Sequence, residues 1–123
     1  MRWVSRFAVL MLCWTGCAAH EKSGDRAAAV GEWKGALKAY QQALMDDPSS
    51  PQLRRKYQQA KQEAVAASVR RAQSCASLLD WQCALNEADF ALGLDASNPE
   101  LTAFRVESAR SFSRALLQHA RDD

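Results

Sequence analysis

The chain contains an internal repeat, and the period of this repeat constrains the fold more than any other feature. When residues 32–53 are laid over residues 80–101, identical residues meet at a single offset of 48 without a gap. The pairs are Trp33 with Trp81, Ala36 with Ala84, Leu37 with Leu85, Ala43 with Ala91, Leu44 with Leu92, Asp47 with Asp95, Ser49 with Ser97, Pro51 with Pro99 and Leu53 with Leu101. Such self-similarity is typical of repeat architectures, in which each unit buries its apolar face against its neighbours.

The residues between and around the two copies favour helix throughout. Ala, Gln, Arg and Leu are abundant, and there are no alternating runs rich in Val, Ile and Thr, so an all-α fold is expected. Ser50-Pro51 and Asn98-Pro99 place a capping residue before a proline, and Asp80 precedes Trp81 as a further cap. The predicted helices cover about 22–30, 32–46, 51–79, 81–94 and 99–120.

The long segment at 51–79 contains no Gly, and no Pro after its first residue, which predicts one continuous helix. Its expected core face follows a spacing of three or four residues: Leu53, Tyr57, Ala60, Ala64, Ala67, Arg71, Cys75 and Leu78.

The first copy of the repeat has a specific pattern of small and aromatic residues. Its positions are Gly31, Trp33, Ala36, Tyr40, Ala43 and Pro48. This pattern resembles the second helix of a tetratricopeptide repeat, and the resemblance implies a short solenoid of antiparallel helical hairpins over residues 27–123. With its long middle helix, the chain also resembles the helical N-terminal part of some secretin-type secretion proteins.

The N-terminus has the form of an export signal. Arg2 and Arg6 precede an apolar run from Phe7 to Trp14, which is shorter than the about 20 residues that a membrane-spanning helix needs. Thr15-Gly16-Cys17 resembles the lipobox of bacterial lipoproteins. This resemblance implies a signal peptide at 1–16, acylation of Cys17, a lipidated tether at 17–26 and, from the residue after the cysteine, sorting to the outer membrane. The alternative is a secretory signal cut near Ala18-Ala19.

Charge and composition argue against several classes of function. The chain has 16 Lys and Arg against 14 Asp and Glu, and two of the cations lie in the predicted signal, so the mature part is neutral. Nucleic-acid binding, which needs a basic excess gathered on one face, has no support. The sequence contains no catalytic motif, and no cofactor is expected. A metal site is not expected either, because His20 and His119 lie at opposite ends of the chain and form no ligand set of recognisable spacing with the cysteines.

Two cysteines remain after the signal and the lipidation residue are set aside. Cys75 and Cys83 lie four residues from either side of the turn near Leu79-Asp80, so an antiparallel hairpin brings them close together. Because an exported protein lies in an oxidising compartment, we expect a disulfide. Two buried free thiols are the alternative.

The last helix carries more apolar surface than a terminal helix of a repeat protein needs. One expected stripe comprises Leu101, Phe104, Phe112, Ala115 and Leu116, and a second comprises Val106, Ala109, Leu117 and Ala120. Since terminal helices normally have a polar outer face, the second stripe is predicted to be a protein-contact surface for a partner or a second copy.

These observations together predict a non-enzymatic, lipid-anchored periplasmic protein that binds other envelope proteins as a scaffold or assembly factor. Lipoproteins with tetratricopeptide units assist secretion, pilus assembly and outer-membrane assembly, which is what the resemblance implies. The alternatives are a structural lipoprotein without a dedicated peptide site and a soluble secreted helical domain.

Overall fold

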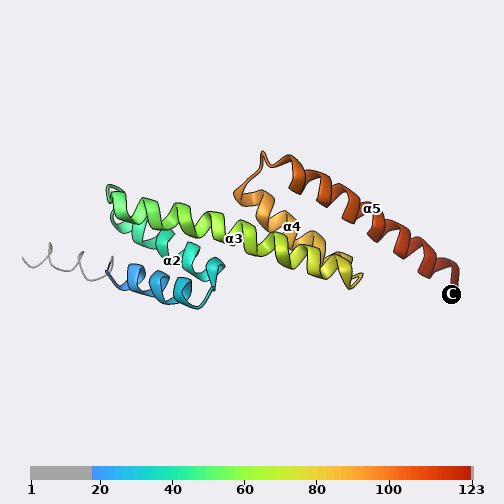
Figure 1. Cartoon of the computed structure of the whole chain (residues 1–123), viewed down its shortest axis with the longest axis horizontal. Helices are drawn as coiled ribbons and strands as arrows, with labels where there is room; N and C mark the ends of the chain where they lie inside the picture. Colours follow the sequence, from blue (N-terminus) through green and yellow to red (C-terminus); the bar gives the residue numbers. More distant parts are fainter. Residues whose placement is uncertain (1–17, 123) are drawn as a thin grey trace, which may run out of the picture. The chain divides into compact units, whose positions relative to one another are not determined.

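The computed structural model describes residues 18–122, and all of its regular structure in that range is helical. A first helix is described over residues 18–29, followed by α2 (Trp33–Asp46), α3 (Pro51–Ser77), α4 (Trp81–Leu94) and α5 (Pro99–Asp122) (Figure 1). The all-α prediction is confirmed, and the predicted helix ends agree to within four residues. The predicted signal at 1–16 and the lipidation residue Cys17 lie outside the described residues.

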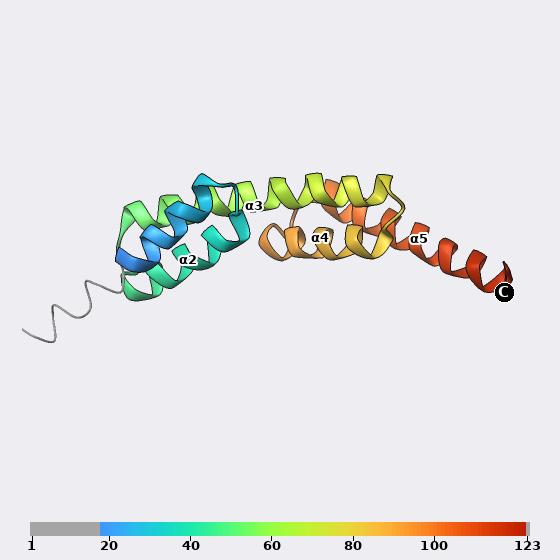
Figure 2. The ribbon, with the colours of Figure 1, turned by 90° about the horizontal axis from the view of Figure 1, so that it is seen from below.

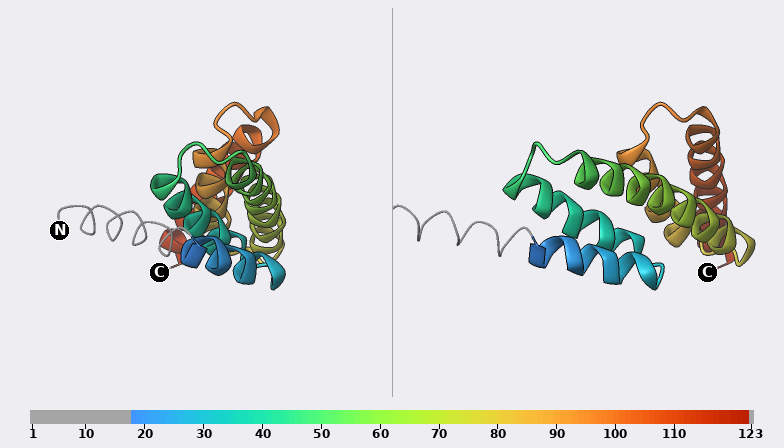
Figure 3. Two further views of the ribbon diagram at one scale, coloured as in Figure 1. Left: turned by 90° about the vertical axis from the view of Figure 1, so that its left-hand side faces the viewer. Right: turned by 60° about the vertical axis from the view of Figure 1, so that its left-hand side comes forward.

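Two compact units divide the chain in the middle of α3, one ending at Glu63 and the other beginning at Ala64. In the first unit, the first helix, α2 and the beginning of α3 lie side by side (Figure 3). In the second unit, the remainder of α3 and α4 form an antiparallel pair, and α5 lies next to α4 (Figures 1 and 2). The division falls within the predicted repeat domain at 27–123.

Small residues form most of the core. Ala36 and Ala43 of α2 and the matching Ala84 and Ala91 of α4 are completely inaccessible to solvent. An alanine at a helix contact lets the two backbones approach closely, and the close-packed interior that results tolerates little change in volume. The repeat found in the sequence therefore corresponds to equivalent buried positions in the two units.

The buried face of α3 differs from the predicted stripe in its second half. Leu53, Ala60 and Ala64 are buried as expected, but the buried residues that follow are Ser68 and Ala72. Arg71 and Leu78, which were predicted for this face, are exposed. The face thus continues at steps of four residues, because this part of α3 packs on partners in the second unit rather than the first.

The hairpin turns of the two units share one backbone motif. At the end of the first helix, the Glu32 amide donates to the Ala27 carbonyl at 2.9 Å, and Gly31 adopts a φ of 76°. At the end of α3, the Asp80 amide donates to the Cys75 carbonyl at 2.9 Å, and Leu79 adopts a φ of 63°. Both are Schellman caps, which require a left-handed residue and normally use glycine.

The predicted capping residues make the expected hydrogen bonds. The Leu53 amide donates to the Ser50 hydroxyl at 3.3 Å, and the Leu101 amide donates to the Asn98 side-chain oxygen at 3.1 Å. The Cys83 amide donates to the Asp80 carboxylate at 3.0 Å. These side chains satisfy amides that the first turn of a helix leaves without a partner, and so they fix where α3, α4 and α5 begin.

The segment that was predicted as a lipidated tether, at 17–26, overlaps the first helix. Residues 18–26 belong to the first helix, and Gly24 is buried. An isolated helix of this length is marginal in water, so packing on α2 and α3 must supply the stabilisation.

Candidate protein-contact surface

The predicted contact residues lie on α5, and helix lengths determine how much of α5 is covered. α4 has 14 residues and α5 has 24, which correspond to about 21 Å and about 36 Å at the usual rise per residue. α5 therefore continues past the turn that joins α3 to α4 (Figures 1 and 2). Leu101 and Ser108 are buried, whereas every residue from 113 to 122 is exposed.

The second stripe is accessible, as its predicted role requires. Val106 is 42% exposed and Leu117 is 63% exposed. Ala120 is also exposed, and Ala109 is half-buried. A shallow, open depression lies along the N-terminal part of this stripe, lined by Arg105, Val106, Ala109, Arg110, Ser113 and Arg114.

The first stripe of α5 is only partly internal. Leu101 is buried and Phe104 and Phe112 are half-buried, but Ala115 is exposed and Leu116 is 54% exposed. Both stripes are thus bare beyond Phe112, since neither α4 nor the end of α3 extends that far along α5. The exposed apolar surface is larger than predicted and includes two adjacent leucines.

Arginines border this surface. Arg105 pairs with Asp89 of α4, and Arg110 and Arg114 both pair with Glu107, at 3.7 Å and 3.1 Å. Arg121 is followed by Asp122 and Asp123, so residues 107–123 carry three arginines and three acidic residues and no net charge.

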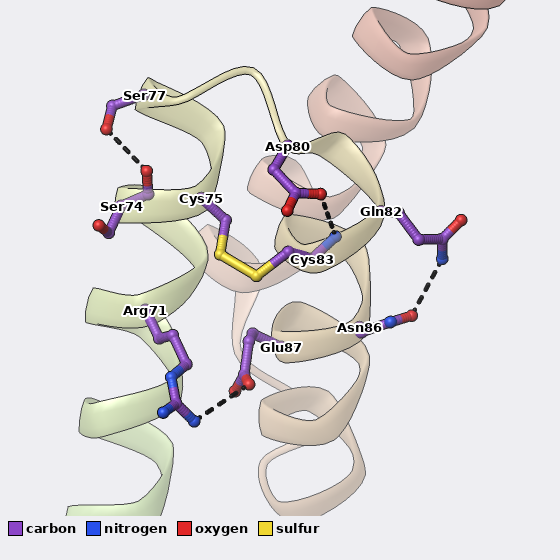
Figure 4. Close-up of a disulfide and its surroundings, with 9 residues drawn as sticks. All are labelled: Arg71, Ser74, Cys75, Ser77, Asp80, Gln82, Cys83, Asn86 and Glu87. Atoms are coloured by element: carbon purple, nitrogen blue, oxygen red, sulfur yellow. Dashed lines mark hydrogen bonds and ion pairs between the residues drawn. A yellow bond between two sulfur atoms is a disulfide. The ribbon is translucent and has the colours of Figure 1, made fainter.

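The hairpin that supports α5 is joined by the predicted pair of cysteines. The sulfur atoms of Cys75 and Cys83 are 2.00 Å apart and their Cα atoms 5.8 Å apart, as in a disulfide (Figure 4). One turn further from the bridge, Arg71 of α3 pairs with Glu87 of α4 at 3.5 Å (Figure 4). Both contacts hold α4 against α3 and so fix the platform on which the first half of α5 rests.

A polar cluster in the first unit was missed by sequence reasoning. The Lys56 ammonium donates to Glu21 at 2.8 Å and to both oxygens of Asp25 at 2.9 Å. The Tyr40 hydroxyl donates to Asp25 at 2.6 Å. The cluster joins the first helix, α2 and α3, and no sequence signal marks it, because Lys56 is 35 residues from Glu21.

The pKa values of this cluster follow from its contacts. Burial, reinforced by the bond to Asp25, raises the pKa of Tyr40 to about 12. The hydrogen bonds from Tyr40 and then Lys56 lower the pKa of Asp25. Burial alone would lower the pKa of Lys56, but its bonds to Glu21 and Asp25 outweigh this and raise it. All three groups keep their usual charges at neutral pH, so the cluster is a structural tie.

The described part of the chain shows neither a metal site nor a membrane-spanning helix. Among residues 18–122, no three His, Cys, Asp or Glu side chains gather as metal ligands would. None of the helices in that range is both long enough and apolar enough to cross a bilayer. Comparison with models of protein families, with curated proteins and with solved structures finds no match for this chain. The bare part of α5 is accordingly the candidate that the geometry favours.

Proposed function

We propose that this chain is a lipid-anchored helical-repeat protein of the periplasmic face of the outer membrane, and that it binds another polypeptide of an envelope complex through α5. The exposed stripe of Val106, Leu117 and Ala120 carries the proposal. Large apolar side chains that gather on one side of a helix mark contact surfaces more often than chance exposure does.

The tetratricopeptide-like arrangement supports the same function. Equivalent alanines are buried in both units, and the turn inside each hairpin has the same Schellman cap. Stacked helical hairpins present extended surfaces for other proteins and offer few enclosed pockets, which favours a scaffold or an assembly factor over an enzyme.

The proposed lipid anchor is an acyl group on Cys17, and this proposal rests on the sequence. Mass spectrometry of the mature N-terminus should find an acylated cysteine, and Cys17→Ala should move the protein from the membrane fraction to the soluble fraction. A mature N-terminus at Ala18 or later would identify a secreted protein instead.

A double variant tests protein binding. Val106→Glu with Leu117→Glu should abolish co-purification of the partner while leaving helical content and melting temperature nearly unchanged, because both side chains are exposed. Met45→Glu is the matched control, since Met45 is 70% exposed on α2 in the other unit. If the double variant retains every co-purifying protein, a structural lipoprotein without a dedicated peptide site is the better description.

A further inference from the structure

The offset of 48 residues also relates the helices, since α3 begins at Pro51 and α5 at Pro99, although few residues beyond Leu101 are identical at this offset. It places residues 18–26 of the first helix at residues 66–74 of α3 and at residues 114–122 of α5. In each of the first two copies, this segment is the first helix of a hairpin, and the hairpin's second helix is α2 or α4. The end of α5 therefore holds the position of a first helix in a third hairpin.

Equivalent residues differ sharply in burial between the copies. Gly24 in the first copy and Ala72 in the second are both buried, whereas Ala120 in the third is exposed. At the equivalent position four residues earlier, Ser68 is 2% exposed, whereas Leu116 in the third copy is 54% exposed and His20 in the first copy is exposed as well. Among the described residues, the position beside α5 that corresponds to α4 beside α3 is unfilled.

We infer that an amphipathic helix of another polypeptide docks against residues 112–122 of α5, in the position that α4 occupies against α3. The inference rests on the proposed function, because it specifies the class of partner. The docked helix would repeat the packing of α4 on α3. It would therefore run antiparallel to α5, and like α4 it would have about four turns. The partner thus supplies the second helix of the third hairpin.

The packing of α4 specifies the contact face of this partner. α4 presents alanines at positions i, i+4 and i+7, namely Ala84, Ala88 and Ala91, and all three are completely buried. Because α5 has leucines where α3 has Ser68 and Val69, the opposing helix needs small residues even more than α4 does.

A second copy and a lipid surface fit less well. The alanine face of α4 in a second copy is already buried within that copy. Residues 113–122 contain only two large apolar side chains, Leu116 and Leu117, whereas helices that insert in a membrane interface have a longer apolar row.

A peptide with the sequence of residues 80–97 and Cys83→Ser provides the probe. It is fluorescently labelled and titrated against the protein as its host produces it, purified in mild detergent. The Cys75–Cys83 bond holds the chain's own α4 in place, so the peptide cannot exchange with it. We expect saturable binding with one peptide per protein.

Matched variants localise the binding. Leu116→Gln with Leu117→Gln should weaken binding about tenfold or more, because burial of one leucine is worth about a factor of ten. Met45→Gln should bind as the parent does. A peptide in which Ala84, Ala88 and Ala91 are all glutamine should not bind, although it remains a good helix former.

Failure to bind, or equal binding by the double glutamine variant, would overturn the inference. Adsorption of the stripe to phosphatidylglycerol vesicles without peptide binding would assign the surface to lipid. Dimerisation that the double glutamine variant abolishes, again without peptide binding, would assign it to a second copy. If the peptide fails while Val106→Glu with Leu117→Glu still removes a co-purifying protein, only the inference fails and the proposed function stands.

Discussion

Replacement of Gly24 by alanine tests the packing of the first unit at its closest contact. A Cβ atom at this position would lie 2.5 Å from Cε1 and 2.7 Å from Cδ1 of the Tyr40 ring. The ring cannot easily move aside, because Tyr40 is buried and its hydroxyl is bonded to Asp25 at 2.6 Å. Either the first helix or α2 must therefore shift.

Two opposing effects set the magnitude. Alanine is favoured over glycine in a helix by about 1 kcal/mol, whereas overpacking of a well-filled contact costs about 1–3 kcal/mol. The contact distances are far below van der Waals separation, so we expect the upper part of that cost and a net loss of about 1–2 kcal/mol. A loss of this size lowers the melting temperature of a domain with 60–100 residues by about 4 °C or more.

Thermal unfolding followed by circular dichroism measures the effect, and two glycines serve as controls. A Cβ at Gly35 would make an ordinary contact with Ala27 at 3.7 Å, and one at Gly93 would meet nothing within 4 Å. Gly35→Ala and Gly93→Ala should each stabilise the protein by about 0.5–1 kcal/mol. If Gly24→Ala stabilises as they do, the close approach of the first helix to α2 is refuted.

A double-mutant cycle tests the same contact in a second way. At the repeat offset, the pair Gly24 and Tyr40 corresponds to Ala72 and Ala88, which are both buried. Gly24→Ala with Tyr40→Ala copies that pair, so its loss should be smaller than the sum of the two single losses. Additive losses would mean that the two side chains do not meet.

Three further predictions concern the turn, the bridge and pH. Leu79→Gly should stabilise the protein by about 1 kcal/mol, because a left-handed leucine is strained, and unchanged or lower thermal stability would contradict this. Thiol labelling of the unfolded protein without reductant should find Cys75 and Cys83 unreactive, and full labelling of both would reject the disulfide. Reduction of the disulfide should lower the free energy of unfolding by about 2–3 kcal/mol, from the entropy of the loop that it closes. The pKa of Tyr40 is raised from 10.0 to about 12, so its contribution to stability is complete below pH 10 and is lost as pH rises through about 12. Tyr40→Phe should flatten part of that alkaline decline in melting temperature, and an identical decline in both proteins would contradict the assignment.

Helix type and most helix ends could be predicted from the sequence because they depend on local signals. Ser50, Asn98 and Asp80 bond to amides three residues ahead, and such caps are visible in a short window. The helicity of residues 18–21, ahead of the helix predicted at 22–30, could not be predicted in this way. It depends on Tyr40 and Lys56, which are distant in sequence, and the local composition by itself favours a polar linker.

The candidate surface was predicted in part. The exposure of Val106 and Leu117 followed from an excess of apolar residues over what one packed face can use. The exposure of Ala115 and Leu116 did not, although a usable signal was present. Predicted helices at 81–94 and 99–120 already differ in length by about two turns, so the longer helix must extend beyond its partner.

Site-specific photo-crosslinking from position 117 in intact cells tests the central claim most directly. A benzophenone side chain at Leu117 should form an adduct with another polypeptide, and mass spectrometry of the digested adduct should locate the crosslink on an alanine-striped helix. The same side chain at Met45, which is 70% exposed on α2 against 63% for Leu117, should give no such adduct. Absence of a protein adduct at position 117, or the same adducts from both positions, would contradict the account.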